Sequence, residues 1–258
     1  MQRTAQLAVI GVGSIAEAIV TGLCAADPDV TVVLSPRGAV RSARLAGRHA
    51  GVWVAPDNQT AVDAADTVLL ALRAADAPAV LGELTFGPDQ RLISVMPTPK
   101  LDELRTLVGP VAELSRAIPA VSVARRAGLT PVFPAGSAAE SMFEQLGSAL
   151  VVDSEPVLDA TSVASATVAA HFAYLTTIAD WVTRQGLPAV DARRVVGAVF
   201  TGVSADLAEP AGFDELARQH ATPGGQNERL LVALRAAGIY ATIDRELGRL
   251  RDEDAATS

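Results

Sequence analysis

The chain has 258 residues, of which 50% are hydrophobic, and a formal net charge of −8 at pH 7. This negative charge argues against a nucleic acid or an anionic membrane surface as the partner. Cys24 is the only cysteine, so the chain has no disulfide framework of its own. A single thiol suits a reducing compartment, and we therefore expect the protein to be cytoplasmic.

Short apolar runs alternate with helical patterns through the first part of the chain. The apolar runs lie in QLAVIGVG, TVVLSPRG, GVWVA, TVLLALR and RLISVMP, and segments such as AEAIVTGLCAA and KLDELRTLVG separate them. VAELSRAIP adds a strand, and LTPVFPAG adds an edge or antiparallel strand because Pro131 and Pro134 disfavour a central position. Strands separated by helices of this length are typical of parallel βαβ units. We therefore predict an α/β domain with a Rossmann-like parallel sheet over residues 1–153.

The pattern becomes wholly helical after Asp153. We expect Ser154 to cap the first helix, with Pro156 in its first turn. Apolar residues then recur at helical spacing as far as Leu250, interrupted by GLP, EPAG and TPGG, and the polar tail RDEDAATS is expected to fray. We therefore predict an all-helical second domain over residues 154–258.

One apolar segment has the length of a membrane span. Residues 162–179, SVASATVAAHFAYLTTIA, contain no Asp, Glu, Lys or Arg. They are rich in Ala, Ser and Thr, His171 lies in their middle, and no basic cluster flanks them. We therefore expect no membrane span and interpret the segment as a helix that protein buries on all sides.

A glycine-rich fingerprint, residues 11–16, follows the first predicted strand and opens a helix. Gly11, Gly13 and Ala16 have the spacing G-x-G-x-x-A of a dinucleotide-binding turn. Gly11 permits the tight turn, Gly13 lets a pyrophosphate approach the backbone, and Ala16 keeps helix and strand close. The amides of Ser14 and Ile15, at the helix start, would meet the diphosphate. The sequence therefore predicts a dinucleotide site, with an ordinary glycine-rich βα turn as the alternative.

The end of the second predicted strand favours NADP(H) over NAD(H). An NAD site usually has an Asp or Glu there for the ribose 2′-hydroxyl, whereas TVVLSPRG has Ser35 and Arg37. A guanidinium and a hydroxyl suit a 2′-phosphate, and Arg41 and Arg44 follow on the next helix. The alternative is that Arg37 is a solvated loop cation.

Several segments resemble, in order and spacing, landmarks of the pyrroline-5-carboxylate reductase family. IGVGSIAEAIVTGL is similar to the opening of that family, LSPR to its 2′-phosphate loop, and DNQTAVDAADTVLLALR to its asparagine-containing turn and fourth strand. MFEQLGSALVVDSEPVLDA, ADWVTRQGLP and TPGG are similar to later landmarks, so the resemblance covers nearly the whole chain. It implies reduction of a cyclic imine carboxylate to proline with NADPH, and a homodimer of interlocking C-terminal helices centred on residues 162–179.

The resemblance also implies further site residues. Cofactor contacts would fall on Asn58, Ala71 and Leu72 in addition to the fingerprint. The turn TPGG would bring the start of a helix against an anionic substrate, so that the substrate contacts fall on Gly224, Gly225 and Gln226. Close approach of the ligand to the backbone would then explain both glycines.

The positions that face the substrate in that family differ here. The hydroxyl thought to protonate the imine falls on Asn227, whose amide can donate a hydrogen bond but is not a proton source. The Ala-Gly pair beside the nicotinamide becomes Met96 and Pro97, and the Ser-Gly-Ser-Gly-Pro-Ala-Tyr stretch falls on residues 164–170, without its glycines and proline.

Other side chains are candidates for the altered catalytic site. Thr222 keeps a hydroxyl in the turn, although it could cap the next helix instead. His171 could protonate an imine product, or it could be a hydrogen-bonded histidine of a dimer core. Further candidates are Tyr174 and His220 as proton donors and Arg125 and Arg126 as a carboxylate clamp.

These features predict an NADPH-dependent reductase that acts on the imine, or on the carbonyl, of a small molecule. We expect this substrate to be anionic, as pyrroline-5-carboxylate is. A related substrate is as compatible with the altered motifs as pyrroline-5-carboxylate itself, because function lies in the site rather than in the fold. The alternative is a non-catalytic NADP-binding dimer that acts as a sensor or scaffold. No metal-ligand spacing is visible, so we expect no metal site.

Overall fold

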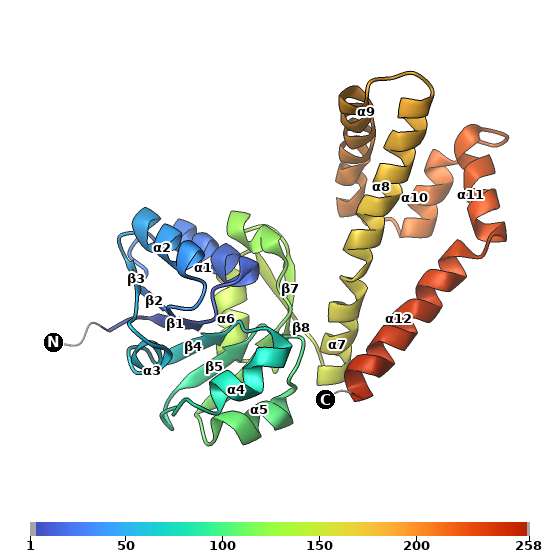
Figure 1. The fold of residues 1–258 in the computed structure, drawn as a ribbon. Helices are drawn as coiled ribbons and strands as arrows, with labels where there is room; N and C mark the ends of the chain where they lie inside the picture. The colour runs from blue at the N-terminus through green and yellow to red at the C-terminus, as the bar shows by residue number, and fades with distance from the viewer. Residues whose placement is uncertain (1–3, 257–258) are drawn as a thin grey trace. The chain divides into compact units, whose positions relative to one another are not determined.

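The computed structural model describes residues 4–256 and divides into two compact units (Figure 1). The first unit comprises the chain up to Ser162 together with its end from Asp254, and the second comprises Val163–Glu253. The division falls later than residue 153, because the first turns of the helix that follows pack with the first unit. Residues 1–3 and 257–258, at the ends of the two predicted ranges, lie outside the described residues.

The first unit contains an eight-stranded sheet in the order β3-β2-β1-β4-β5-β6-β7-β8. Neighbouring strands are parallel except β6 and β7, as a Rossmann-like sheet requires. The strands are β1 (Leu7–Ile10), β2 (Val32–Leu34), β3 (Val52–Val54), β4 (Thr67–Leu70), β5 (Arg91–Ser94), β6 (Glu113–Ala117), β7 (Leu129–Phe133) and β8 (Ser148–Val151).

Strand β7 is antiparallel to β6 but does not form the edge of the sheet. It lies between β6 and β8, and Pro131 pairs with Leu150 of β8. The carbonyl of Pro131 still accepts a hydrogen bond from the amide of Ile118, at 3.0 Å. A proline lacks only the backbone N–H donor, so Pro131 keeps the carbonyl acceptor to which Ile118, just after β6, donates.

Helices cover both faces of the sheet (Figure 1). Leu7 and Val9 of β1 pack into one core with α1, while Ala8 and Ile10 pack into the other with α4. This alternation is the two-residue period of a strand that is buried on both faces. The helices of this unit are α1 (Ser14–Ala26), α2 (Ala39–Arg48), α3 (Asn58–Val62), α4 (Ala77–Leu81), α5 (Leu101–Val108) and α6 (Ala138–Gln145), with 3-10 turns η1 (Ala74–Asp76) and η2 (Val121–Arg125).

The chain is helical from Glu155 onwards, as the sequence predicts. The helices are α7 (Glu155–Ala164), which spans the division between the units, α8 (Thr167–Arg184), α9 (Ala189–Gly202), α10 (Phe213–His220), α11 (Gln226–Ala236) and α12 (Ile239–Ala256), with η3 (Val203–Ala208). Helix α12 continues beyond Leu250, so the expectation of a frayed tail is wrong there. Arg249 pairs with Glu246 and Glu253, at the spacings that stabilise an exposed helix.

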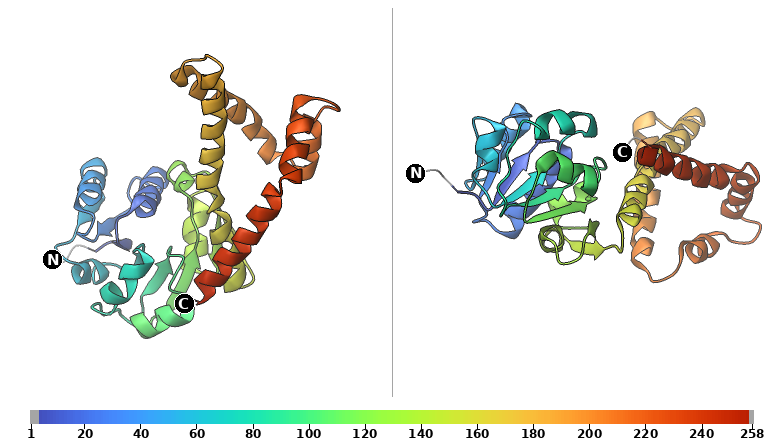
Figure 2. Two further views of the ribbon diagram at one scale, coloured as in Figure 1. Left: turned by 45° about the vertical axis from the view of Figure 1, so that its right-hand side comes forward. Right: turned by 90° about the horizontal axis from the view of Figure 1, so that it is seen from below.

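Helix α8 packs beside α9 (Figures 1 and 2). None of the residues of α8 is buried within its own chain. Its apolar side chains Val168, Phe172 and Trp181 are more than half exposed. Among the described residues, Glu155–Arg184 is the one helical stretch whose length and hydropathy would suffice to cross a membrane, and 6% of its apolar window is buried. No residue of α8 is buried in this structure, and a second chain is the cover that the sequence predicts.

We predict opposite effects for two glycine-to-alanine substitutions in α1 and α2. A Cβ on Gly22 would overlap the carbonyl oxygen of Val123 in η2, whereas one on Gly47 meets no heavy atom within 4 Å. Gly22→Ala should lower the free energy of unfolding by about 1–3 kcal/mol, as overpacking does. Gly47→Ala should leave it unchanged or raise it by up to about 1 kcal/mol. Urea unfolding of both variants measures this; equal effects would contradict the packing of α1 on η2.

Candidate functional site

The strand order reverses at β1, because β2 and β4 flank it, and open α/β sheets bind ligands at the carboxyl edge of such a point. Gly11 follows β1 at this point with φ +90°, and a Cβ there would lie 2.6 Å from the carbonyl oxygen of Ala71. The amide of Ala71 in turn donates to the carbonyl of Ile10. Only glycine fits this close turn between the ends of β1 and β4.

Gly13 and the start of α1 leave room for a ligand. Gly13 is the N-cap of α1 without a side-chain hydrogen bond, and a Cβ built on it meets no heavy atom within 4 Å. The amides of Ser14 and Ile15 follow at the helix start, and Ala16 is fully buried against the sheet. Open space in front of a helix N-terminus is where a pyrophosphate binds, so these residues fit the cofactor that the sequence predicts.

The side chain of Ser35 is buried beneath the fingerprint turn and forms hydrogen bonds there. Its hydroxyl oxygen accepts a hydrogen bond from the amide of Gly11 at 3.0 Å, and the Ser42 hydroxyl donates to its carbonyl at 3.2 Å. Ser35 is fully buried. The hydroxyl is thus engaged beneath the turn, and the predicted contact of Ser35 with a 2′-phosphate stays a prediction.

Four arginines and two carboxylates surround the ends of β2 and β4. The Arg37 guanidinium lies 3.4 Å from Asp76, and Arg73 pairs with the same carboxylate at 2.8 Å. Arg41 lies 3.3 Å from Glu17, to which Arg44 is also paired, and its Nη2 donates to the hydroxyl of Ser14 at 3.3 Å. The cations outnumber the anions, and Arg41 connects this positive surface to the start of α1, as a site for a 2′-phosphate requires.

The other predicted cofactor residues lie at the same edge. Leu72 has Cδ2 3.0 Å from the Cβ position of Gly11, next to Ala71. Asn58 is the first residue of α3, directly after the N-cap Asp57. The backbone amide of Thr60 donates to the Asp57 carboxylate and lowers the pKa of that group.

The turn at residues 222–227 has its own reasons for two glycines. Gly224 has φ +72°, and a Cβ on Gly225 would lie 2.8 Å from the carbonyl oxygen of Thr222. The amide of Gly225 donates to that carbonyl at 2.8 Å, and the amide of Gly224 donates to the Glu228 carboxylate at 2.6 Å. The turn therefore has internal reasons for both glycines, and both amides are already engaged within it; the predicted close approach of a ligand stays a prediction.

Asn227 and His220 complete the polar contacts of this turn. The Asn227 side-chain nitrogen donates to the carbonyl of His220 at 3.0 Å, and His220 Nε2 lies 3.0 Å from Asp206. The sequence did not predict the roles of Asp206 and Glu228, because no local pattern shows which acidic side chains contact this turn. Gln226 begins α11 beside these groups.

His171 has its ring contacts in α8 and α9 rather than in the turn. Its ring centroid lies 5.8 Å from Phe172 and 6.1 Å from Phe200, which also contacts Tyr174. Arg126 is engaged at a loop, where its Nε donates to the carbonyl of Gln145 at 3.1 Å. The structure therefore brings Thr222, Gln226 and Asn227 together but gives His171 aromatic neighbours.

Two further observations concern alternative sites for a ligand or a metal ion. A cavity of about 320 Å³ opens at the amino-terminal edge of the strands, beside Thr67, Arg91 and Glu113. Ligands of open α/β sheets bind at the carboxyl edge, so this cavity does not compete with the fingerprint as the cofactor site. Within residues 4–256, no group of three or more His, Cys, Asp or Glu side chains could hold a metal ion.

Two family profiles match separate parts of the chain. Residues 6–98 match the profile described as NADP oxidoreductase coenzyme F420-dependent, and residues 155–254 match that of pyrroline-5-carboxylate reductase dimerisation. Of the two coenzymes in the first description, the arginines around β2 favour NADP.

Similar proteins span the whole chain. Pyrroline-5-carboxylate reductase from Pseudomonas aeruginosa is 27% identical over 98% of this chain and 96% of its own length, and the one from Synechocystis is 27% identical over 92% of each. Among solved structures, 1-pyrroline-5-carboxylate reductase from Streptococcus pyogenes has a TM-score of 0.83 at 22% identity, covering 98% of this chain and 99% of that chain. A reductive aminase from Aspergillus terreus has a TM-score of 0.63 at 17% identity, covering 95% and 88%.

An NADP-type Rossmann sheet joined to a helical dimerisation segment defines a two-part oxidoreductase that acts on C=N bonds and forms homodimers. Together, the two profile matches and the relatives that span the chain support a member of the pyrroline-5-carboxylate reductase family. The family and the fold class predicted from the sequence are thereby confirmed.

We predict that NADPH binds at least about tenfold more tightly than NADH, a difference of roughly 1.4 kcal/mol. Arg37, 57% exposed, is free to exchange Asp76 for a phosphate, and Arg37→Asp should abolish the preference. Arg48→Asp, in the last turn of α2, the helix that follows Arg37, is the matched control and should keep the preference. Titration of both cofactors by fluorescence measures the ratio; equal affinities in the unmodified protein would contradict the assignment.

Proposed function

We propose that the protein is a reductase that adds a hydride and a proton across the C=N bond of a small molecule, with NADPH as the hydride source. The observation that carries this proposal is the fingerprint turn. Gly11 is locked between two strand ends, and Gly13 leaves the start of α1 open beside Arg41. The pyrroline-5-carboxylate reductases of Pseudomonas aeruginosa and Synechocystis support the reaction class, because they align over more than nine-tenths of the chain.

In the proposed reaction each part of the cofactor site has a physical role. The amides of Ser14 and Ile15 hold the pyrophosphate, and Arg37 and Arg41 neutralise the 2′-phosphate, with Asp76 and Glu17 released as counterions. Bound NADPH supplies the hydride.

The proton for the imine nitrogen has to come from another group. The amide of Asn227 is not a proton source, and its hydrogen bond to His220 holds the turn in place. The groups with exchangeable protons at the turn are the Thr222 hydroxyl and the His220 imidazole, which the Asp206 carboxylate orients. His171 is the remaining candidate, on α8 beside Phe200.

We propose a substrate with a carboxylate, held at the start of α11. Glu228 occupies the amide of Gly224, so a substrate carboxylate would take the place of the Glu228 carboxylate there and reach the exposed first turn at Gln226. The first candidate substrate is 1-pyrroline-5-carboxylate, and a related cyclic imine is the second. We place this reaction in the cytoplasm, because a single cysteine suits a reducing compartment. We propose no nucleic acid or membrane partner, because the chain carries a net charge of −8.

The dimer in this proposal uses α8. Phe172 and Trp181 are 62% and 56% exposed, and large apolar side chains left exposed along one helix favour an interface over open solvent. A second chain that covers α8 explains why a helix with the composition of a membrane span belongs to a profile of dimerisation.

A non-catalytic NADP-binding dimer is the second candidate. Two observations favour it: Asn227 stands where the resemblance implies a hydroxyl, and Glu228 already fills the anion position of the turn. This candidate predicts tight binding of NADPH without turnover.

The test is NADPH oxidation over a panel of cyclic imines, with and without a carboxylate, and of keto acids. We expect turnover of at least one cyclic imine carboxylate. Gly225→Val should abolish this activity and leave the affinity for NADPH unchanged, because the pyrophosphate site lies at Gly13. Asn227→Thr should raise the rate on 1-pyrroline-5-carboxylate if that is the substrate, and lower the rate on another substrate to which Asn227 donates a hydrogen bond. Tight NADPH binding with no turnover of any compound would select the non-catalytic candidate.

A further inference from the structure

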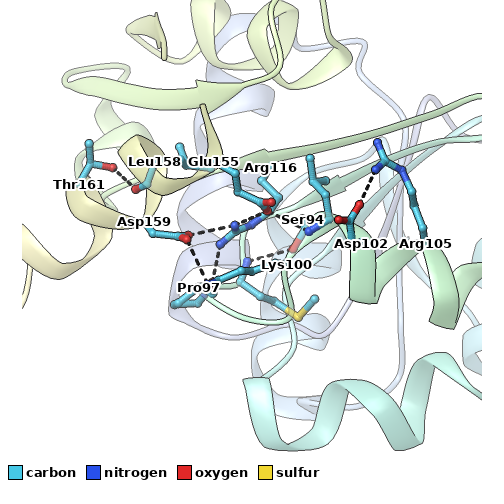
Figure 3. A network of polar contacts seen from close by, with 12 residues as sticks. Ser94, Pro97, Lys100, Asp102, Arg105, Arg116, Glu155, Leu158, Asp159 and Thr161 are labelled. Carbon is cyan, nitrogen blue, oxygen red and sulfur yellow. Dashed lines mark hydrogen bonds and ion pairs between the residues drawn. The ribbon is translucent and has the colours of Figure 1, made fainter. Parts of the chain in front are cut away.

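Arg116 is a charged residue near the carboxyl end of β6, and it is fully buried. Its Nη1 lies 2.5 Å from the Glu155 carboxylate and 3.0 Å from Asp159, and its Nη2 donates to the carbonyl of Pro97 (Figure 3). Its Nε has no hydrogen-bond partner. A buried ionic group of this kind is often replaceable by apolar residues without loss of stability, so its presence calls for a role other than holding the fold.

The first end of this network is the peptide after β5. Pro97 follows β5 at the carboxyl edge of the sheet; its side chain is exposed, whereas its carbonyl faces Arg116. The two halves of a dinucleotide lie on the two sides of the switch point, and the fingerprint with Arg37 and Arg41 occupies the side of β1 and β2. The β4–β5 side therefore receives the nicotinamide half, and the exposed Pro97 lies at that side.

The second end is the beginning of α7. Glu155 and Asp159 are one turn apart, so both face Arg116. The Glu155 carboxylate also accepts the amide of Leu101, at 2.8 Å, and Asp159 lies 3.7 Å from Lys100. Arg116 thus holds the beginning of this loop at Pro97, and the two acids hold its end at Lys100 and Leu101.

We propose that Arg116 is a positioning residue for the nicotinamide half of the cofactor. It fixes the carbonyl of Pro97 and, through Glu155 and Asp159, ties the loop from Pro97 to Leu101 to the helix that leads into the dimerisation segment. The guanidinium fork makes both contacts at once, which the single ammonium of a lysine cannot do. This inference rests on the proposed NADPH site but not on turnover.

The test compares two ligands that differ by the nicotinamide half. Arg116→Lys should leave the Kd of 2′,5′-ADP unchanged within about twofold and weaken NADPH at least about fivefold, a difference that corresponds to roughly 1 kcal/mol. The fluorescence anisotropy of the bound nicotinamide should also fall. Asp159→Asn, which keeps Arg116 and Glu155, should shift both readouts in the same direction to a smaller extent. It serves as the test if Arg116→Lys does not fold.

Asp102→Asn is the matched control, because Asp102 pairs with Arg105 on the exposed face of α5 and lies outside the network (Figure 3). Asp102→Asn should change the affinity for neither ligand. If Arg116→Lys weakens the binding of both ligands equally, or changes the affinity for neither, the inference is overturned. It is also overturned if the unmodified protein binds NADPH no more tightly than 2′,5′-ADP. Protein that binds NADPH more tightly than 2′,5′-ADP but turns over no imine would contradict the proposed reductase and leave the role of Arg116 standing.

Discussion

The close approach between Gly11 and the carbonyl of Ala71 is the constraint on which the cofactor site depends. With φ +90° and a Cβ position 2.6 Å from that oxygen, the turn exists only with glycine. It directs the chain from β1 into α1 at the point where the strand order reverses, and the buried Ser35 hydroxyl holds its amide. Because α1 starts here, its free amides, the open space at Gly13 and the nearby Arg41 face one region of the sheet edge.

The order of strands and helices in the first unit and the site at Gly11, Gly13 and Ala16 could be predicted from the sequence. These features follow from local periodicity and from a motif whose spacing has a backbone cause. The partners of the side chains could not be predicted. Ser35 and Arg37 are two residues apart, yet one is buried under the turn and the other is exposed at Asp76. Arg116 is one charge in an ordinary strand pattern, and only the return of Glu155 from 39 residues away makes it significant.

The second unit shows how a site changes on a retained fold. Its helices follow the predicted pattern and match the dimerisation profile of the family. The turn that opens α11 keeps its glycines for internal reasons, since Gly225 lies against the Thr222 carbonyl and Glu228 takes the amide of Gly224. An intact turn is therefore compatible with more than one ligand, and in the proposed site the side chain of Asn227 would influence the chemistry more than the backbone does.

The central claim is that the start of α1 holds the pyrophosphate of NADPH, and Gly13→Ala tests it most directly. The added methyl group meets no protein atom within 4 Å, and as a helix cap alanine costs about 1 kcal/mol relative to a good capping residue. The account predicts a folded dimer whose affinity for NADPH falls at least about tenfold, roughly 1.4 kcal/mol, because the methyl group occupies the space of the ligand. A folded Gly13→Ala protein that binds NADPH as tightly as the unmodified protein, measured by calorimetric titration, would contradict it.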